Sequence, residues 1–231
     1  MTITLFDLAG AEPDRRFSPY CWRTRLALAH KRLPVETLPW RFTEKERIAP
    51  SGQGRVPVII DADKWIADSW AIANYLEDTY PDRASLFGGE GGRALARFFN
   101  SWVDAVLQPI AVRLVVLDIW QHVDERDKAY FRKSREERFG MPLEQVQADR
   151  DQRVKELWQA LTPARMTLER QKFLGGDTPL YPDYILAGMF LWTRGVSEFP
   201  LLESGDPIAA WRERMLDLYG GLARRAKAYA V

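Results

Sequence analysis

The chain has 231 residues, enough for one large domain or two small ones, and its 28% charged and 46% hydrophobic residues are ordinary for a globular protein. Its 33 basic and 32 acidic side chains nearly cancel, which argues against nucleic acid or another polyanion as a partner. Cys21 is the only cysteine, so the chain cannot form an intrachain disulfide.

The sequence lacks segments typical of a targeting signal or a membrane span. The first residues do not combine a basic region with a long apolar one, so we expect no signal peptide. The longest apolar stretch, at 110–120, contains Arg113 and Asp118 and is too short to cross a bilayer. We therefore expect a soluble, cytoplasmic protein.

Strand and helix signals alternate over residues 1–81. Apolar runs predict strands at 3–8, 35–40, 56–61 and 65–67, and helix-forming residues predict helices at 22–32 and from Ser69 to a point before Pro81. The first two strands should pair in parallel through the crossover helix, and the turn at 61–64 predicts a hairpin. This order is typical of a small α/β unit.

Helical periodicity replaces the strand signals in the rest of the chain. Residues 82–92 are rich in glycine and small polar residues, and we interpret them as a linker between domains at 1–81 and 93–231. Helices are predicted from residue 93, where Phe98, Trp102 and Val106 are four apart, and at 151–167, 181–194 and 211–229. The charged stretch 124–138 is interpreted as a solvated helix or a connector.

The start of the first helix places a hydroxyl beside unpaired backbone N–H groups. Pro19 suits the first turn of a helix, which puts Ser18 near the N-cap, at the positive end of the helix dipole. Such a position can hold an anion, including a thiolate. Taken alone, Ser18 fits a simple helix cap equally well.

Three segments together resemble the glutathione transferase superfamily. They are Ser18-Pro19-Tyr20-Cys21 at the start of a helix, Val56-Pro57 after a polar loop, and Asp68-Ser69 at the start of another helix. The resemblance covers essentially the whole chain and implies a thioredoxin-like domain followed by an all-α domain. Segments 17–31 and 68–76 look closest to the bacterial lignin β-etherases and the fungal etherase-like transferases.

The resemblance implies a role for each motif. Ser18 would be the catalytic residue, donating a hydrogen bond to the sulfur of glutathione, whose thiol is mostly protonated at neutral pH. Val56 would precede a cis Pro57 and pair its backbone with the cysteinyl part, with an ordinary trans proline as the alternative. Ser69 would receive the γ-glutamyl carboxylate with Asp68 near the ammonium, although both could simply cap a helix.

Other candidates carry equally plausible structural interpretations. Further residues expected at the glutathione site are Cys21, Trp40, Gln53 and Arg55. For Trp40, Gln53 and Arg55 the alternative is an ordinary residue of a surface loop. Trp102, Tyr181 and Tyr184 are candidates for the electrophile pocket, with core packing as the alternative. Leu180 replaces the Ser or Thr that the family carries three residues before Asp183, which puts the local capping in doubt. Two histidines and one cysteine give little support to a metal site.

The resemblance implies a homodimeric glutathione transferase with glutathione as co-substrate, no metal and an aromatic electrophile, acting in detoxification or aromatic-compound metabolism. In the etherase-like subgroup the reaction is β-aryl ether cleavage. Two alternatives stay open. One is a thiol transferase that depends on Cys21, and the other is a non-catalytic carrier of glutathione or aromatic ligands.

Overall fold

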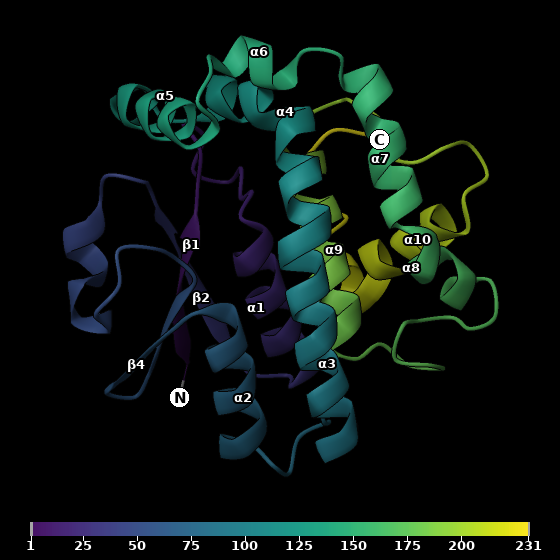
Figure 1. The fold of residues 1–231 in the computed structure, drawn as a ribbon. Helices are drawn as coiled ribbons and strands as arrows, with labels where there is room; N and C mark the ends of the chain where they lie inside the picture. The colour runs from purple at the N-terminus through teal and green to yellow at the C-terminus, as the bar shows by residue number, and fades with distance from the viewer. Residues whose placement is uncertain (1, 231) are drawn as a thin grey trace.

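A computed structural model describes residues 2–230, and its first part is built on a four-stranded mixed sheet (Figure 1). The strands are β1 (Ile3–Leu8), β2 (Val35–Trp40), β3 (Val58–Asp61) and β4 (Lys64–Ala67), in the order β2-β1-β3-β4. β1 and β2 are parallel, whereas β3 is antiparallel to both β1 and β4. The predicted crossover and hairpin are therefore confirmed.

Helices α1 (Pro19–His30) and α2 (Ser69–Thr79) complete the α/β part, together with a short 3-10 helix, η1 (Lys45–Ser51). α1 packs against α9 (Tyr181–Val196) of the helical part, so it lies between the sheet and the second half of the chain. β1 is almost continuously buried, whereas β2 is exposed at its start because it forms the edge of the sheet.

The named elements of the second part of the chain are all helices (Figure 1). It begins with a long rod that consists of α3 (Glu90–Trp102), the π-helical turn η2 (Val103–Leu107) and α4 (Gln108–His122). The remaining helices are α5 (Glu125–Phe139), α6 (Leu143–Gln147), α7 (Arg150–Ala160), α8 (Thr162–Leu168) and α10 (Pro207–Gly221). Within residues 2–230, no helix combines the length and apolar character that a membrane span requires. The predicted fold class, a thioredoxin-like domain followed by an all-α domain, is confirmed.

Several predicted helix boundaries were wrong. The helix expected at 151–167 is divided into α7 and α8 because Pro163 has no N–H with which to continue α7. The helix expected at 211–229 starts at Pro207 and loses its helical backbone at 218–220, where Gly220 has a φ of +68°. The helix expected from residue 93 begins at Glu90.

Asp183 resolves the doubt about the start of α9. Leu180 occupies the N-cap and has no side-chain acceptor, but the carboxylate of Asp183 accepts a hydrogen bond from the Leu180 N–H at 3.0 Å. It also accepts from the N–H groups of Leu174 and Gly175 and from the Trp211 indole. Burial raises the pKa of this carboxyl group, while these donors stabilise its charge. The acidic half of a capping box is thus kept without the hydroxyl half.

Candidate functional site

Ser18 is the N-cap of α1, as predicted. Its Oγ accepts a hydrogen bond from the Cys21 N–H at 3.2 Å, and Pro19 occupies the first turn. The extended backbone of Ser18 (φ −83°, ψ 126°) aims the first turn of α1 at a cavity that the Ser18 side chain lines. The positive end of the helix therefore faces a space large enough for a ligand.

This cavity, of about 610 Å³, lies between the two parts of the molecule. Leu8 and Trp40, at the carboxyl ends of the parallel strands β1 and β2, form one side of it, which is where ligands of open α/β sheets commonly bind. The first-part lining also includes Phe17, Ser18, Pro19, Tyr20, Phe42, Lys45, Gly54, Arg55 and Val56. Helices α4 and α5 face them across the cavity.

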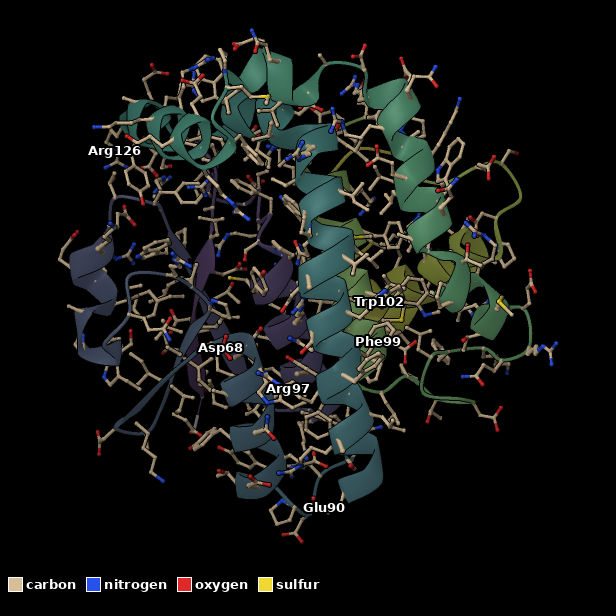
Figure 2. The ribbon with its side chains drawn as sticks, in the orientation of Figure 1. Asp68, Glu90, Arg97, Phe99, Trp102 and Arg126 are labelled. Atoms are coloured by element: carbon tan, nitrogen blue, oxygen red, sulfur yellow. The ribbon has the colours of Figure 1, made fainter. Side chains whose placement is uncertain are left out.

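The Val56-Pro57 peptide bond is cis, which confirms the prediction for this position. Val56 lines the cavity, and the Pro57 carbonyl accepts a hydrogen bond from the Asp68 N–H at 3.2 Å. Asp68, labelled in Figure 2, caps α2 by accepting hydrogen bonds from the N–H groups of Trp70 and Ala71, both at 3.0 Å. The structure therefore brings two of the predicted motifs together on adjacent strand ends.

Asp68 holds an unusual backbone conformation, with φ +77° and ψ 129°. Positive φ is uncommon outside glycine, and Asp and Asn tolerate it better than most residues. Ser69 follows as the first residue of α2 and is buried, and its carbonyl accepts a hydrogen bond from the Tyr181 hydroxyl at 2.8 Å. The turn is thus held from both the sheet and the helical part.

Cys21 does not lie where a ligand could reach it. Its side chain is 0% exposed and is absent from the cavity wall. Burial, and then the nearby carboxylate of Asp7, raise the pKa of the thiol well above its ordinary value, so it stays protonated at neutral pH. The expectation that Cys21 contributes to the glutathione site is corrected, because the first turn of α1 turns it into the core.

The other residues expected at the glutathione site divide between the cavity and the surface. Trp40 and Arg55 line the cavity, and Trp40 is fixed by a hydrogen bond from its Nε1 to the Glu44 carbonyl at 2.7 Å. Gln53 is exposed on the same loop and does not form part of the wall.

The three residues expected in an electrophile pocket pack elsewhere. Tyr181 and Tyr184 are both 0% exposed in the core between α1 and α9, where the Tyr184 hydroxyl lies 2.5 Å from His30 Nδ1. Trp102 lies on the rod beside Phe99, with 5.2 Å between ring centroids (Figure 2). None of these three residues lines the cavity. The two tyrosines are core residues, which was the alternative interpretation.

Helix α5 supplies a wall of the cavity that sequence reasoning missed. Figure 1 shows it beyond the carboxyl end of β1. Buried Asp127 docks α5 onto the loop after β2 by accepting hydrogen bonds from the N–H groups of Phe42 and Thr43, at 2.7 and 3.1 Å. The cavity wall from α5 comprises Tyr130, Phe131, Ser134, Arg135 and Arg138. The signal available in the sequence was the i, i+3, i+4, i+7 spacing of the last four residues.

The rod contributes the rest of the wall at the point where its helical pattern changes. The π-helical turn precedes Gln108, and it places Asp104 and Gln108 on the cavity, as π-turns often do at functional sites. The Asp104 carboxylate is held by buried Arg23 at 2.7 Å and by Asn100 Nδ2 at 2.8 Å. No group of three or more His, Cys, Asp or Glu side chains able to hold a metal ion occurs within residues 2–230.

The chain matches two protein-family models that between them cover most of its length. The model of the glutathione S-transferase N-terminal domain matches residues 17–79, and that of the glutathione S-transferase C-terminal domain matches residues 94–213. A probable glutathione S-transferase of Oryza sativa is 25% identical over 217 residues, which are 85% of this chain and 80% of that protein.

Solved structures agree with these matches. A glutathione S-transferase of Ceriporiopsis subvermispora in complex with glutathione superposes with a TM-score of 0.82 at 25% identity, covering 94% of this chain and 96% of that one. A glutathione transferase of Phanerochaete chrysosporium superposes with a TM-score of 0.75 at 30% identity, covering 96% of this chain and 92% of that one.

Proposed function

This chain belongs to the glutathione S-transferase family, and we propose that it is a transferase that activates the thiol of glutathione at Ser18 for attack on an aromatic electrophile. The observation that carries the proposal is the position of Ser18, which caps α1 and lines the large cavity. The glutathione found in the complex from Ceriporiopsis subvermispora supports glutathione as the co-substrate.

The hydrogen bonding of Ser18 suits this role. Because its Oγ accepts from the Cys21 N–H, the hydroxyl proton is free to be donated to a sulfur in the cavity. Glutathione's thiol has an ordinary pKa near 8.5, and each unit by which that pKa falls corresponds to about 1.4 kcal/mol of preference for the thiolate. The hydroxyl and the N-terminus of α1 both stabilise the anion.

The proposed tripeptide follows the edge formed by the cis-proline turn and α2. The Val56 backbone would pair with the cysteinyl part, and Ser69 and Asp68 would hold the γ-glutamyl carboxylate and ammonium. Trp40 and Arg55, with Lys45 nearby on the same wall, would face the glycyl end. In this proposal the glutathione domain spans 1–81, and a linker at 82–92, whose last three residues already belong to α3, leads to the helical domain at 93–231.

The electrophile would lie against the helical wall. Aromatic rings there and on the facing loop, among them Phe42, Tyr130, Phe131 and Trp192, suit a flat substrate. For the etherase-like subgroup, the reaction is cleavage of a β-aryl ether ketone. The thiolate forms a C–S bond at the carbon next to the carbonyl, the C–O bond breaks, and its electron pair leaves on the phenoxide.

The decisive experiment compares four proteins in glutathione conjugation and β-ether cleavage: wild type, Ser18→Gly, Ser18→Thr and Cys21→Ala. Glycine costs only a few tenths of a kcal/mol as a helix cap, so Ser18→Gly removes the hydroxyl with little loss of the helix. We expect kcat/KM to fall about 10- to 100-fold in Ser18→Gly, the worth of one hydrogen bond to a charged group. Ser18→Thr, which keeps a hydroxyl, should retain most of the activity.

Cys21→Ala separates the proposal from its alternatives. Because the Cys21 thiol is buried and protonated, its loss should leave turnover unchanged. Activity that depends on Cys21 and not on Ser18 would indicate a thiol transferase. Glutathione binding without turnover of any electrophile would indicate a carrier.

We also propose a homodimer formed through α3. Leu95 and Phe98 on this helix are 72% and 73% exposed, which is unusual for large apolar side chains. We call Leu95 and Phe98 the apolar stripe of α3. Each copy would present this stripe to the other about a two-fold axis.

A further inference from the structure

Cationic side chains outnumber anionic ones in the cavity wall. Four cationic side chains line it, two from the first part (Lys45 and Arg55) and two from α5 (Arg135 and Arg138). Its one carboxylate, that of Asp104, is already paired with buried Arg23. Within residues 2–230, the ion pairs of α5 use other side chains on the helix and none involves Arg135 or Arg138.

Arg135 is held in place at the cavity wall. Its guanidinium stacks over the ring of Phe131 at 4.5 Å and lies 5.3 Å from that of Phe42, and it donates a hydrogen bond to Ser134 Oγ at 2.9 Å. Burial lowers the pKa of Arg135, and the neighbouring charges of Arg138 and Arg55 lower it further. The positive charges of Arg55 and Arg138 thus act on Arg135 beside the same cavity, and a bound anion would offset this repulsion.

Gln108 adds an independent observation on the same wall. Its side chain is only 8% exposed and lines the cavity, and its Nε2 donates to no acceptor within the described chain. A buried donor without an acceptor costs about 1–3 kcal/mol. A ligand with an oxygen acceptor beside α4 would remove that cost.

Resting on the proposed function, we infer that the electrophile is an aromatic carboxylate whose negative charge is bound by Arg135 and Arg138, with Gln108 as a further donor. In the proposed binding mode, the γ-glutamyl carboxylate would be held at the start of α2, which is not part of the cavity wall, and the glycyl carboxylate by Lys45 and Arg55. This arrangement leaves the α5 arginines for a second anion. Planar guanidinium groups bind carboxylates through paired hydrogen bonds.

The test uses 4-chloro-3,5-dinitrobenzoate and its methyl ester, which differ in charge but undergo the same substitution. The thiolate forms a C–S bond at the chlorinated carbon, and chloride leaves with the electron pair of the C–Cl bond. Each enzymatic rate is divided by the uncatalysed rate, which removes the difference in intrinsic reactivity. We expect wild type to prefer the acid about tenfold or more, with a preference that falls as salt is added.

Variants of α5 assign this preference to particular side chains. Arg138→Gln, at an exposed position that puts folding at little risk, and Arg135→Gln should each raise the KM of the acid about tenfold and change the KM of the ester less than about twofold. Arg135→Lys should keep part of the preference. Lys133→Gln is the matched control, because it removes one charge from the solvent face of the same helix, where the side chain is 78% exposed.

Two outcomes would overturn the inference. One is equal treatment of acid and ester by wild type. The other is a rise in the KM of glutathione, and not of the acid, in Arg135→Gln and Arg138→Gln, which would assign these arginines to glutathione.

A binding measurement keeps the inference testable if neither electrophile is turned over, a result that would count against the proposed function alone. Quenching of tryptophan fluorescence, with Trp40 and Trp192 in the cavity wall, reports the Kd of unreactive 3,5-dinitrobenzoate and of its methyl ester. The anion site is supported if wild type binds the acid about tenfold more tightly than the ester and if Arg138→Gln loses this preference. Equal Kd values of acid and ester in wild type contradict it.

Discussion

At the scale of the residue, Asp68 combines a structural role as a helix cap with a proposed role in binding glutathione, and one substitution can separate the two. Its carboxylate caps α2, and its φ of +77° favours Asp, Asn or Gly. Asp68→Asn keeps an oxygen for the cap and tolerates the backbone, but it removes the charge proposed to face the ammonium of glutathione. Because Asp68 is exposed, we expect the KM of glutathione to rise only about two- to fivefold, with the melting temperature nearly unchanged.

Steady-state kinetics with glutathione varied, together with thermal melting, check this prediction. Asp68→Gly serves as the control, since glycine accepts the backbone conformation and loses the cap, and it should lower the melting temperature. An unchanged KM in Asp68→Asn would mean that Asp68 acts only as a helix cap.

Single residues were predictable from the sequence where local rules decide their conformation. The N-cap at Ser18 follows from the hydroxyl and from Pro19 in the first turn, and the cap at Asp68 follows from a carboxylate placed just before a run of helix-forming residues. Accessibility obeys no such local rule. Cys21 lies three residues after Ser18, yet it faces the core and the serine faces the cavity, a difference set by how α1 packs.

At the scale of the element, the contact between α1 and α9 positions Ser18, and Gly188 makes this contact possible. A Cβ atom at Gly188 would lie 2.4 Å from the carbonyl oxygen of Pro19, the residue that follows Ser18. Because a backbone atom cannot move aside, Gly188→Ala should push α9 away from the first turn of α1. We expect a loss of about 1–3 kcal/mol in the free energy of unfolding and a lower kcat/KM.

Urea denaturation and conjugation kinetics measure the two effects. Gly91→Ala is the matched control, because nothing lies within 4 Å of a Cβ atom at this position in α3. There alanine should stabilise the protein by up to about 1 kcal/mol through its higher helix propensity. Equal stabilisation by both substitutions would contradict the role given to Gly188.

The charged stretch 124–138 forms a helix, α5, which agrees with one of its two interpretations, but its place in the cavity wall was not predicted. In α5, charged side chains outnumber apolar ones, so its periodicity indicates a solvated helix, although one face lines the cavity. Which face lines the cavity is decided by the hydrogen bonds of buried Asp127, which hold the helix against the loop after β2. The helical wall of the cavity therefore depends on contacts between residues far apart in the sequence, which short-range patterns do not report.

At the scale of the whole molecule, the order of elements was sufficient to predict the architecture. A parallel pair, a hairpin and a run of helices allow few arrangements, and the resemblance selected one of them. The placement of the cavity was harder to predict because its walls come from segments that are more than a hundred residues apart, such as Phe17 and Trp192. The two tyrosines expected there instead join α9 to α1 and α2.

The exposed stripe on α3 leads to a prediction for the assembly. Leu95 and Phe98 are about three-quarters exposed, and burying such side chains is worth about 1.5–3 kcal/mol each. In a two-fold dimer each residue of the stripe is buried in both copies, so one substitution changes the interface at two places. We expect wild type to be a dimer at micromolar concentration and Phe98→Glu to be a monomer, as measured by light scattering after gel filtration. The circular dichroism spectrum should be the same for both proteins.

Met166→Glu is the control, because Met166 is 60% exposed on α8, away from the stripe, and its substitution should leave the dimer intact. A monomeric wild type would contradict the prediction, whereas a dimer that survives Phe98→Glu would place the interface on another face of the molecule.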